Sequence, residues 1–205
     1  MKKLLKTIGI LFLFAVGYYV WHVHLNFRFE EISKDKVYKS ALIDPKKIDK
    51  FLLKNNIKTV VDFLDPGVQD ALNPAQQKNI DEEDSAIKSF NEKYDKNVSH
   101  INIPSGQVPT KETLTKFFTV LDNPESYPVL IHCYHGTGRA AIYSALYRVE
   151  YEDWKNKDAR TKTRVIVEGL GYRSSFSNGK AKGDFLMNYK PRSAGENSTM
   201  NNLSH

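Results

Sequence analysis

The stretch PVLIHCYHGTGRAAIYSAL, residues 128–146, contains the only cysteine of this 205-residue chain. The apolar run over residues 127–132 predicts a buried strand that ends just before Cys133. Residues 140–151 follow with apolar side chains at helical spacing. The sequence therefore places its one thiol in a glycine-containing loop between a strand and a helix.

Such a loop is suited to binding an anion. Its backbone N–H groups and the N-terminus of the following helix supply positive potential. Gly136 and Gly138 permit tight turns, and Arg139 can bind two oxygens with its planar guanidinium. The same field favours the thiolate form of Cys133. A thiolate aimed at a bound tetrahedral dianion predicts nucleophilic attack on a phosphomonoester. His132, the last residue of the strand, is expected to hydrogen-bond the loop and hold its shape.

The segment HCYHGTGRA, His132 to Ala140, resembles the HCxxGxxR loop of the protein tyrosine and dual-specificity phosphatases. The resemblance extends over about residues 36–190 and is strongest to compact bacterial members of the dual-specificity type. It implies that Cys133 forms a phosphocysteine, that Arg139 binds the phosphoryl group, and that no metal or other cofactor is needed. It further implies that main-chain amides cradle the phosphate, namely those of Tyr134, His135, Gly136, Thr137, Gly138 and Arg139.

The chain departs from the family pattern at two places. Ala140 stands where the family usually has a serine or threonine that helps the thiolate leave. The loop that normally supplies the general acid reads PSGQVPTKE and has no acid before Glu112, while Gln107 can only position a water. Asp65 follows another strand at the same edge of the sheet and is the candidate substitute acid, with a turn residue before Pro66 as the alternative. His135 is a weaker candidate whose expected role is to line the pocket.

Three functions are compatible with this loop. The first is a phosphatase acting through Cys133, and the second is a phosphate-binding module with impaired turnover. The third is a rhodanese-like sulfurtransferase. Five residues separate Cys133 from Arg139, which is the phosphatase spacing, whereas sulfurtransferases typically have four.

The rest of the body alternates helical and strand patterns, which predicts an α/β fold with a mostly parallel central sheet flanked by helices, similar to dual-specificity phosphatases. The sequence pattern predicts strands within residues 57–64 and 98–104, in addition to the one before Cys133. Residues 79–97 are expected to form an exposed helix or a long loop. Helices are expected after Asp44-Pro45, after Asn73-Pro74, and over residues 110–123, 140–151, 156–171 and 180–190.

The N-terminal segment is a separate unit. Residues 7–27 contain no charged side chain and are long enough to span a bilayer as a helix. Lysines precede this segment and aromatic residues lie near its end, which predicts a single-pass anchor in the inner membrane with a periplasmic domain. A cleaved signal peptide is the alternative. The expected division is an anchor over 1–27, a phosphatase-like domain over 28–190, and a disordered polar tail over 191–205.

The charge pattern bears on possible partners. The formal net charge is +6, and residues 154–205 alone carry ten basic and four acidic side chains. Together with the anchor, this excess suits a phosphorylated protein, a lipid phosphate or an inositol phosphate as substrate. No nucleic-acid recognition motif is present in the sequence, so no nucleic-acid partner is expected.

Overall fold

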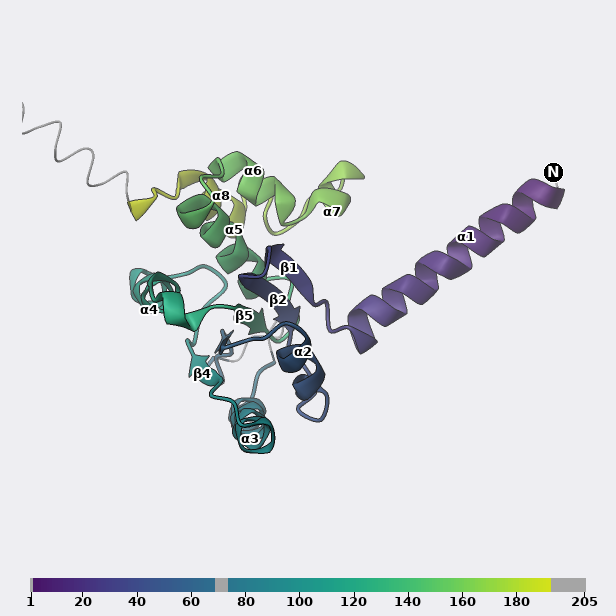
Figure 1. The fold of residues 1–205 in the computed structure, drawn as a ribbon. Helices are drawn as coiled ribbons and strands as arrows, with labels where there is room; N and C mark the ends of the chain where they lie inside the picture. The colour runs from purple at the N-terminus through teal and green to yellow at the C-terminus, as the bar shows by residue number, and fades with distance from the viewer. Residues whose placement is uncertain (1, 69–73, 193–205) are drawn as a thin grey trace, which may run out of the picture.

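The computed structural model describes residues 2–68 and 74–192, and these form one layered α/β body with a long helix projecting from it (Figure 1). The sheet has five strands in the order β1-β2-β5-β3-β4. Strand β1 is antiparallel to β2, and the other three pairings are parallel. The sheet is therefore mostly parallel, as expected, with one antiparallel strand at its edge. The strands are β1 (Glu30–Ser33), β2 (Val37–Ala41), β3 (Thr59–Asp62), β4 (Ser99–Asn102) and β5 (Val129–Cys133).

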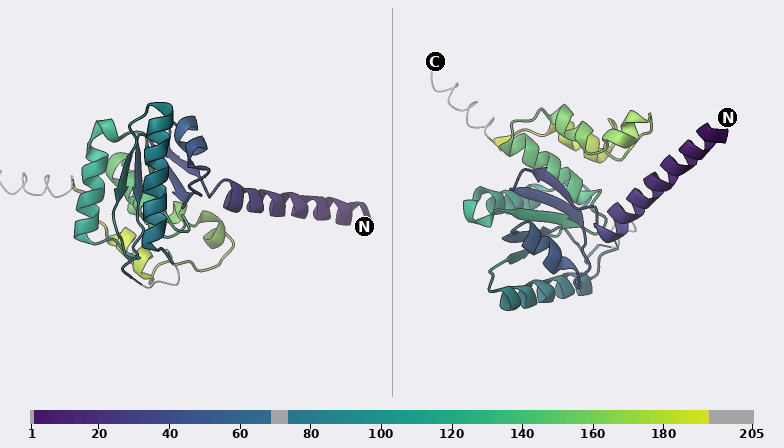
Figure 2. Two further views of the ribbon diagram at one scale, coloured as in Figure 1. Left: turned by 90° about the horizontal axis from the view of Figure 1, so that it is seen from below. Right: turned by 45° about the vertical axis from the view of Figure 1, so that its right-hand side comes forward.

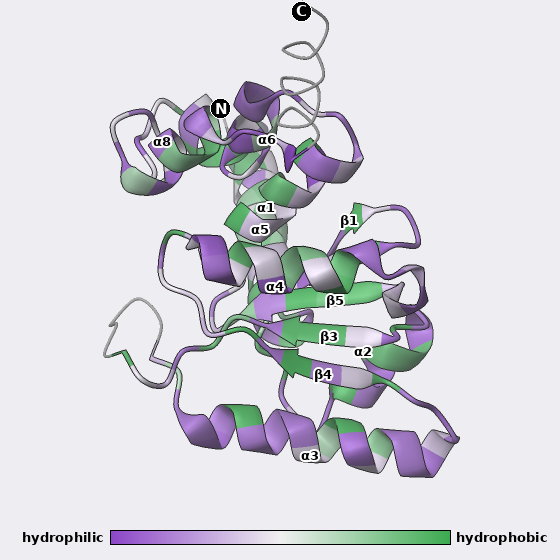
Figure 3. Cartoon of the chain, turned by 90° about the vertical axis from the view of Figure 1, so that its left-hand side faces the viewer, coloured by the Kyte–Doolittle hydropathy of each residue, from purple (hydrophilic) through white to green (hydrophobic). Residues whose placement is uncertain are grey.

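The two central strands form the core of the sheet. Every residue of β3 and β5 is buried, which explains their nearly continuous apolar sequences (Figure 3). Side chains of an extended strand alternate between faces. Val61 and Ile131 therefore enter one apolar cluster and Val60 and Leu130 the other.

Helices cover both faces of the sheet (Figure 2). On the face of Val61 lie α4 (Lys111–Asp122) and α5 (Arg139–Tyr151), and on the face of Val60 lie α2 (Ile48–Lys54) and α3 (Gln77–Tyr94). Helices α6 (Asn156–Lys162) and α8 (Ala181–Asn188) pack on α5 and on each other. The short helix α7 (Val165–Gly169) follows α6. Tyr143 and Tyr147 on α5 are buried against the sheet.

Two expectations about elements need correction, and two strands had no prediction. Helix α2 begins only at Ile48, because Asp44 Oδ1 accepts from the Lys46 N–H in a turn before the helix. The basic stretch 156–171 is two helices, interrupted where Arg164 leaves the helical conformation (φ −145°, ψ 35°). Strands β1 and β2 were not predicted, since they are short and β2 contains the polar residues Lys39 and Ser40.

Residues 79–97 were expected to form either an exposed helix or a long loop, and the structure shows a helix. The helix runs from Gln77 to Tyr94. Asn73, the expected cap, lies outside the described residues, as does most of the polar tail.

The N-terminal helix α1 (Lys2–Val20) continues into a π-helical turn (Trp21–Leu25) and projects away from the sheet (Figure 1). The helical segment Lys3–Leu25 is long and apolar enough to cross a membrane, with a mean hydropathy of 1.7. None of its apolar stretch is buried against the rest of the protein. A signal sequence near an N-terminus has the same properties.

Candidate active site

Cys133 is the last residue of β5, and the loop of residues 134–138 leads from it directly into α5. Its side chain is buried, and it lies in register beside Ala41 of β2. A pocket of about 300 Å³ opens over this loop. Cys133 and Arg139 both line the pocket, so the structure brings together the two residues expected to act on a phosphate.

The loop depends on one glycine for its path. Gly136 has a φ of +69°, a conformation that disfavours residues with a side chain. A Cβ atom there would lie 2.6 Å from the backbone nitrogen of Ala41 and 2.7 Å from the carbonyl oxygen of Ser40. The loop therefore packs backbone to backbone against the end of β2.

Three cations donate to three successive carbonyl groups of the loop. Arg28 Nη1 donates to the carbonyl oxygen of His135 (2.9 Å), Lys39 Nζ to that of Gly136 (3.3 Å), and Arg164 Nη2 to that of Thr137 (3.0 Å). In a trans peptide the N–H points opposite to the C=O. The amides of residues 136, 137 and 138 are thereby turned away from these cations, as an anion-binding loop requires.

Arg139, the first residue of α5, is only 2% exposed. Its Nε donates to the carbonyl oxygen of Gly106 at 3.3 Å. The neighbouring Ser105 Oγ lies 2.9 Å from the hydroxyl of Tyr143 on α5. The loop after β4 thus helps to set the direction of the Arg139 guanidinium.

Two cations besides Arg139 line the pocket, and the sequence did not single them out for this role. They are Arg164, between α6 and α7, and Lys182 of α8. Lys182 is buried, and its Nζ would lie 3.2 Å from a Cβ atom on Gly138. The adjacent Gly183 packs so closely that a Cβ there would lie 2.3 Å from the carbonyl oxygen of Phe176. Close packing of α8 therefore fixes Lys182 above the loop.

The structure places the other predicted residues as follows. Gln107 and His135 line the pocket, while Asp65 is not among its lining residues. Asp65 Oδ1 instead accepts from the Gly67 N–H at 3.1 Å, as in the turn-residue alternative. Burial and the nearby charge of Arg28 lower the pKa of His135, so its imidazole is neutral at pH 7. Ala140 is completely buried.

The expected hydrogen bond from His132 to the loop is absent among the described residues. The reason is strand geometry, because adjacent residues of β5 point to opposite faces of the sheet. His132 therefore points away from the Cys133 side, and its Nε2 lies 3.0 Å from Oε2 of Glu83 on α3.

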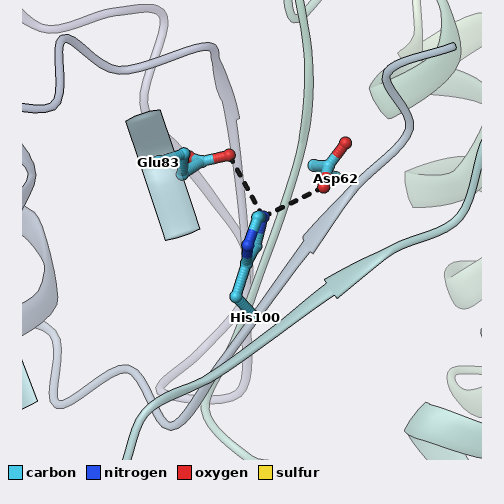
Figure 4. Close-up of side chains that lie close together, drawn as sticks. All are labelled: Asp62, Glu83 and His100. Atoms are coloured by element: carbon cyan, nitrogen blue, oxygen red, sulfur yellow. Dashed lines mark ion pairs between the residues drawn. The ribbon is translucent and has the colours of Figure 1, made fainter. Parts of the chain in front are cut away.

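Glu83 belongs to a buried group of four ionisable side chains, three of which Figure 4 shows. His100 Nε2 lies 3.0 Å from Asp62 Oδ2 and 3.4 Å from Glu83 Oε2. Burial opposes the charge on Glu83, yet His132 and His100 lower its pKa to about 2. Burial likewise opposes the charge on His100, yet Asp62 and Glu83 raise its pKa to about 10.

No pattern described above for the sequence predicts this group. A usable signal existed on α3, where Ile80, Ile87 and Phe90 form one buried face. Glu83 lies on that same face, where an apolar residue is the rule.

The fold and the loop are those of the protein tyrosine and dual-specificity phosphatase superfamily. Residues 45–177 match the family described as a DSP-PTPase phosphatase fused to NAD+ kinase. This match covers more than half of the chain, so the chain belongs to that family. The match also favours the phosphatases over the sulfurtransferases. No curated protein matches the chain by sequence.

Solved structures share the fold at low sequence identity. The core catalytic domain of the PP-IP phosphatase SIW14 from S. cerevisiae is 18% identical with a TM-score of 0.56, and the alignment covers 86% of this chain and 93% of that one. TpbA of P. aeruginosa is 19% identical with a TM-score of 0.54 and coverages of 80% and 86%. PTPMT1 is 16% identical with a TM-score of 0.52 and coverages of 86% and 99%.

Proposed function

We propose that this chain hydrolyses phosphomonoesters through a phosphocysteine at Cys133. The Cys133 thiolate attacks phosphorus, so that an S–P bond forms and the bond to the leaving oxygen breaks. Water then attacks the phosphocysteine, the S–P bond breaks, and inorganic phosphate leaves. Arg139 and the amides of residues 134–139 stabilise the negative charge on the phosphoryl oxygens in both steps.

One observation carries this proposal. The Cys133 side chain lies at the start of a loop whose carbonyl groups at 135, 136 and 137 each accept from a cationic side chain. The buried guanidinium of Arg139 lies in the same pocket. Such an arrangement concentrates donors on an anion next to the sulfur.

The test is phosphate release from an aryl phosphate by the full chain and by Cys133→Ser. We expect the variant to lose more than about 1,000-fold in kcat while it still binds vanadate. Equal rates in the two proteins would refute the role of Cys133.

For the substrate, we propose a phosphate ester that carries further anionic groups, such as an inositol phosphate or a lipid phosphate. Arg164 and Lys182 line the pocket beside Arg139, so a ligand with more than one anionic group would meet more than one cationic side chain. The similarity to SIW14, described as a PP-IP phosphatase, agrees with this choice. A phosphorylated protein is the other substrate class, and a panel of inositol phosphates, lipid phosphates in vesicles and phosphopeptides separates the two.

The second candidate function is a phosphate-binding module with slow turnover. It is favoured by Ala140, which lacks the hydroxyl that aids release of the thiolate. Among the described residues, moreover, no carboxylate lines the pocket. Rapid-mixing kinetics separate the two functions, because a slow module releases one equivalent of product and then nearly stops.

For the proton donor we keep Asp65 as the first residue to test, since it follows β3 at the edge of the sheet where the loop begins. If it donates the proton, Asp65→Asn lowers kcat and flattens the acidic limb of the rate profile. The same substitution at Asp44, another turn residue, serves as the control. An unchanged rate in Asp65→Asn removes Asp65 from the mechanism.

We further propose that α1 anchors the domain to the inner membrane, with the domain on the periplasmic side. Exposed apolar side chains on α7 and just after it support a position of the domain close to a membrane. Ile166, Leu170 and Tyr172 are each about 70% exposed or more. One pocket is lined both by Tyr19 at the end of α1 and by Ile166, so the two apolar segments are neighbours.

Membrane fractionation and the mass of the mature N-terminus test this placement. Retention of residues 1–27 in an integral membrane fraction supports an anchor. A mature chain that begins after Gly17 would show a cleaved signal peptide instead.

A further inference from the structure

We propose that Asp62, Glu83, His100 and His132 form a binding site for one divalent transition-metal ion, with Zn²⁺ as the best fit. The residues come from β3, α3, β4 and β5. Their site lies on the face of the sheet opposite the phosphate pocket, directly behind Cys133.

Donor atoms of three of these residues are spaced as ligands of one ion would be, and the fourth residue, His132, approaches the same oxygen of Glu83 as His100 does. One donor atom from each of Asp62, Glu83 and His100 lies within 4.8 Å of the others (Figure 4). The contacts between nitrogen and oxygen measure 3.0 Å (His100 to Asp62), 3.4 Å (His100 to Glu83) and 3.0 Å (His132 to Glu83). A tetrahedral zinc site with bonds of about 2.0–2.1 Å has edges of about 3.3–3.4 Å between its ligand atoms.

The contacts do not have the geometry of hydrogen bonds. Asp62 Oδ2, Glu83 Oε2 and the Nε2 atoms of His100 and His132 are all buried without a hydrogen-bond partner among the described residues. They approach one another at contact distance without an aligned N–H. This is the arrangement expected when nitrogen and oxygen lone pairs face a common centre.

Neighbouring groups orient the ligands as in known metal sites. Asp62 Oδ1 accepts from the Leu64 N–H (2.9 Å) and from Asn102 Nδ2 (2.6 Å), which leaves Oδ2 to face the cluster. His100 Nδ1 lies 3.5 Å from Asp84 Oδ1. A histidine ligand commonly directs its other ring nitrogen to a carboxylate in this way.

Burial makes charge balance decisive. All four side chains are at most 5% exposed. Two carboxylates and two neutral imidazoles would leave two uncompensated negative charges, a costly state in the interior. A divalent cation would balance these two negative charges, and protonation of both histidines would balance them equally well. Metal analysis distinguishes the two states.

The donor set indicates the kind of ion. Two imidazole nitrogens exclude Ca²⁺ and Mg²⁺ as preferred ions, since these take oxygen ligands. Zn²⁺ accepts nitrogen and carboxylate ligands in a tetrahedron. Because the ligands are buried protein side chains, the ion would be structural, joining α3 to three strands.

The first experiment uses the untagged full chain, dialysed against Zn²⁺ and then against buffer, with metal measured by mass spectrometry. We expect one equivalent of Zn²⁺ per chain, a lower melting temperature after chelation, and recovery when Zn²⁺ is returned. Co²⁺ loading should give the visible absorption of a four-coordinate site without thiolate ligands.

Variants then locate the ion. Glu83→Gln should weaken Zn²⁺ binding more than 100-fold, whereas Asp84→Asn, which alters only an orienting contact, should weaken it about 10-fold. Glu82→Gln, on the solvent side of the same helix, is the matched control and should bind Zn²⁺ normally. Cys133→Ser should also retain the ion, which excludes binding at the thiol.

The inference fails if the wild-type chain holds no stoichiometric Zn²⁺ and its melting temperature is indifferent to chelation. In that case the cluster is a salt-bridged network of protonated histidines. It fails equally if Glu83→Gln and Glu82→Gln bind the same amount of metal. None of these readouts uses catalysis, so they are independent of the proposed function.

Discussion

A Cβ atom on Gly136 would lie 2.7 Å from the carbonyl oxygen of Ser40, so the loop after Cys133 packs backbone to backbone against strand β2. This contact joins the loop to a strand nearly a hundred residues earlier in the chain. It also determines how far the loop can lie from the sheet and hence where its amides point.

Gly136→Ala should therefore disrupt both stability and activity. The substitution combines a positive φ with overlap against backbone that cannot rotate away. We expect a loss of about 2–4 kcal/mol in the free energy of unfolding, measured by urea denaturation, and loss of aryl phosphatase activity. Gly67→Ala is the control, since its Cβ would meet only Asp65 Oδ1 at 3.4 Å. Equal stability of the two variants would contradict this account of the loop.

Lys182→Gln should affect large anionic substrates more than small ones. Lys182 lines the pocket next to Gly138 but outside the phosphate loop itself. Loss of one charged contact should raise KM for an inositol polyphosphate about 10–100-fold and change KM for an aryl phosphate less than about threefold. Lys180→Gln, an exposed lysine at the start of the same helix, should change neither value. Identical effects on both substrates would assign Lys182 to the phosphoryl group itself.

Tyr143→Phe should loosen the loop that contacts Arg139. The Tyr143 hydroxyl lies 2.9 Å from Ser105 Oγ, while its ring stacks on Phe63 and should stay in place. We expect a loss of about 1 kcal/mol of stability and a lower kcat, because Gly106 accepts from Arg139. In a double-mutant cycle, Ser105→Ala should add little to Tyr143→Phe. Tyr147→Phe, a buried tyrosine of the same helix, should leave kcat unchanged.

Ala140→Ser should speed the second half of the reaction. It supplies the hydroxyl that related phosphatases usually carry after the arginine. If breakdown of the phosphocysteine limits turnover, kcat should rise about 10-fold and the initial burst of product should shrink. Ala141→Ser, one position further along α5, is the control. A burst that stays the same in Ala140→Ser would show that release of the thiolate is not rate-limiting.

The architecture could be predicted in part from the sequence. Continuous apolar runs indicated β3 and β5, and helical spacing indicated α4 and α5, because buried strands and amphipathic helices have distinct periods. Strands β1 and β2 escaped prediction because they are short and partly polar, and the sheet stabilises them more than their own sequences do. The break between α6 and α7 depends on one residue's conformation and had no signal in hydropathy.

The candidate active site, too, could be predicted from the sequence only in part. The residues from His132 to Ala140 are contiguous, and a strand, a glycine loop and a helix N-terminus together determine where an anion binds, so the local sequence sufficed to predict phosphate chemistry at Cys133. The four cations around the loop, Arg28, Lys39, Arg164 and Lys182, come from distant segments. The cluster of Asp62, Glu83, His100 and His132 likewise forms only when three strands and α3 pack together. Local sequence determines the hydrophobic periodicity and the backbone conformation of each segment. Contacts between polar side chains from distant segments depend on the order of the strands and the packing of the helices, and only the tertiary structure decided these.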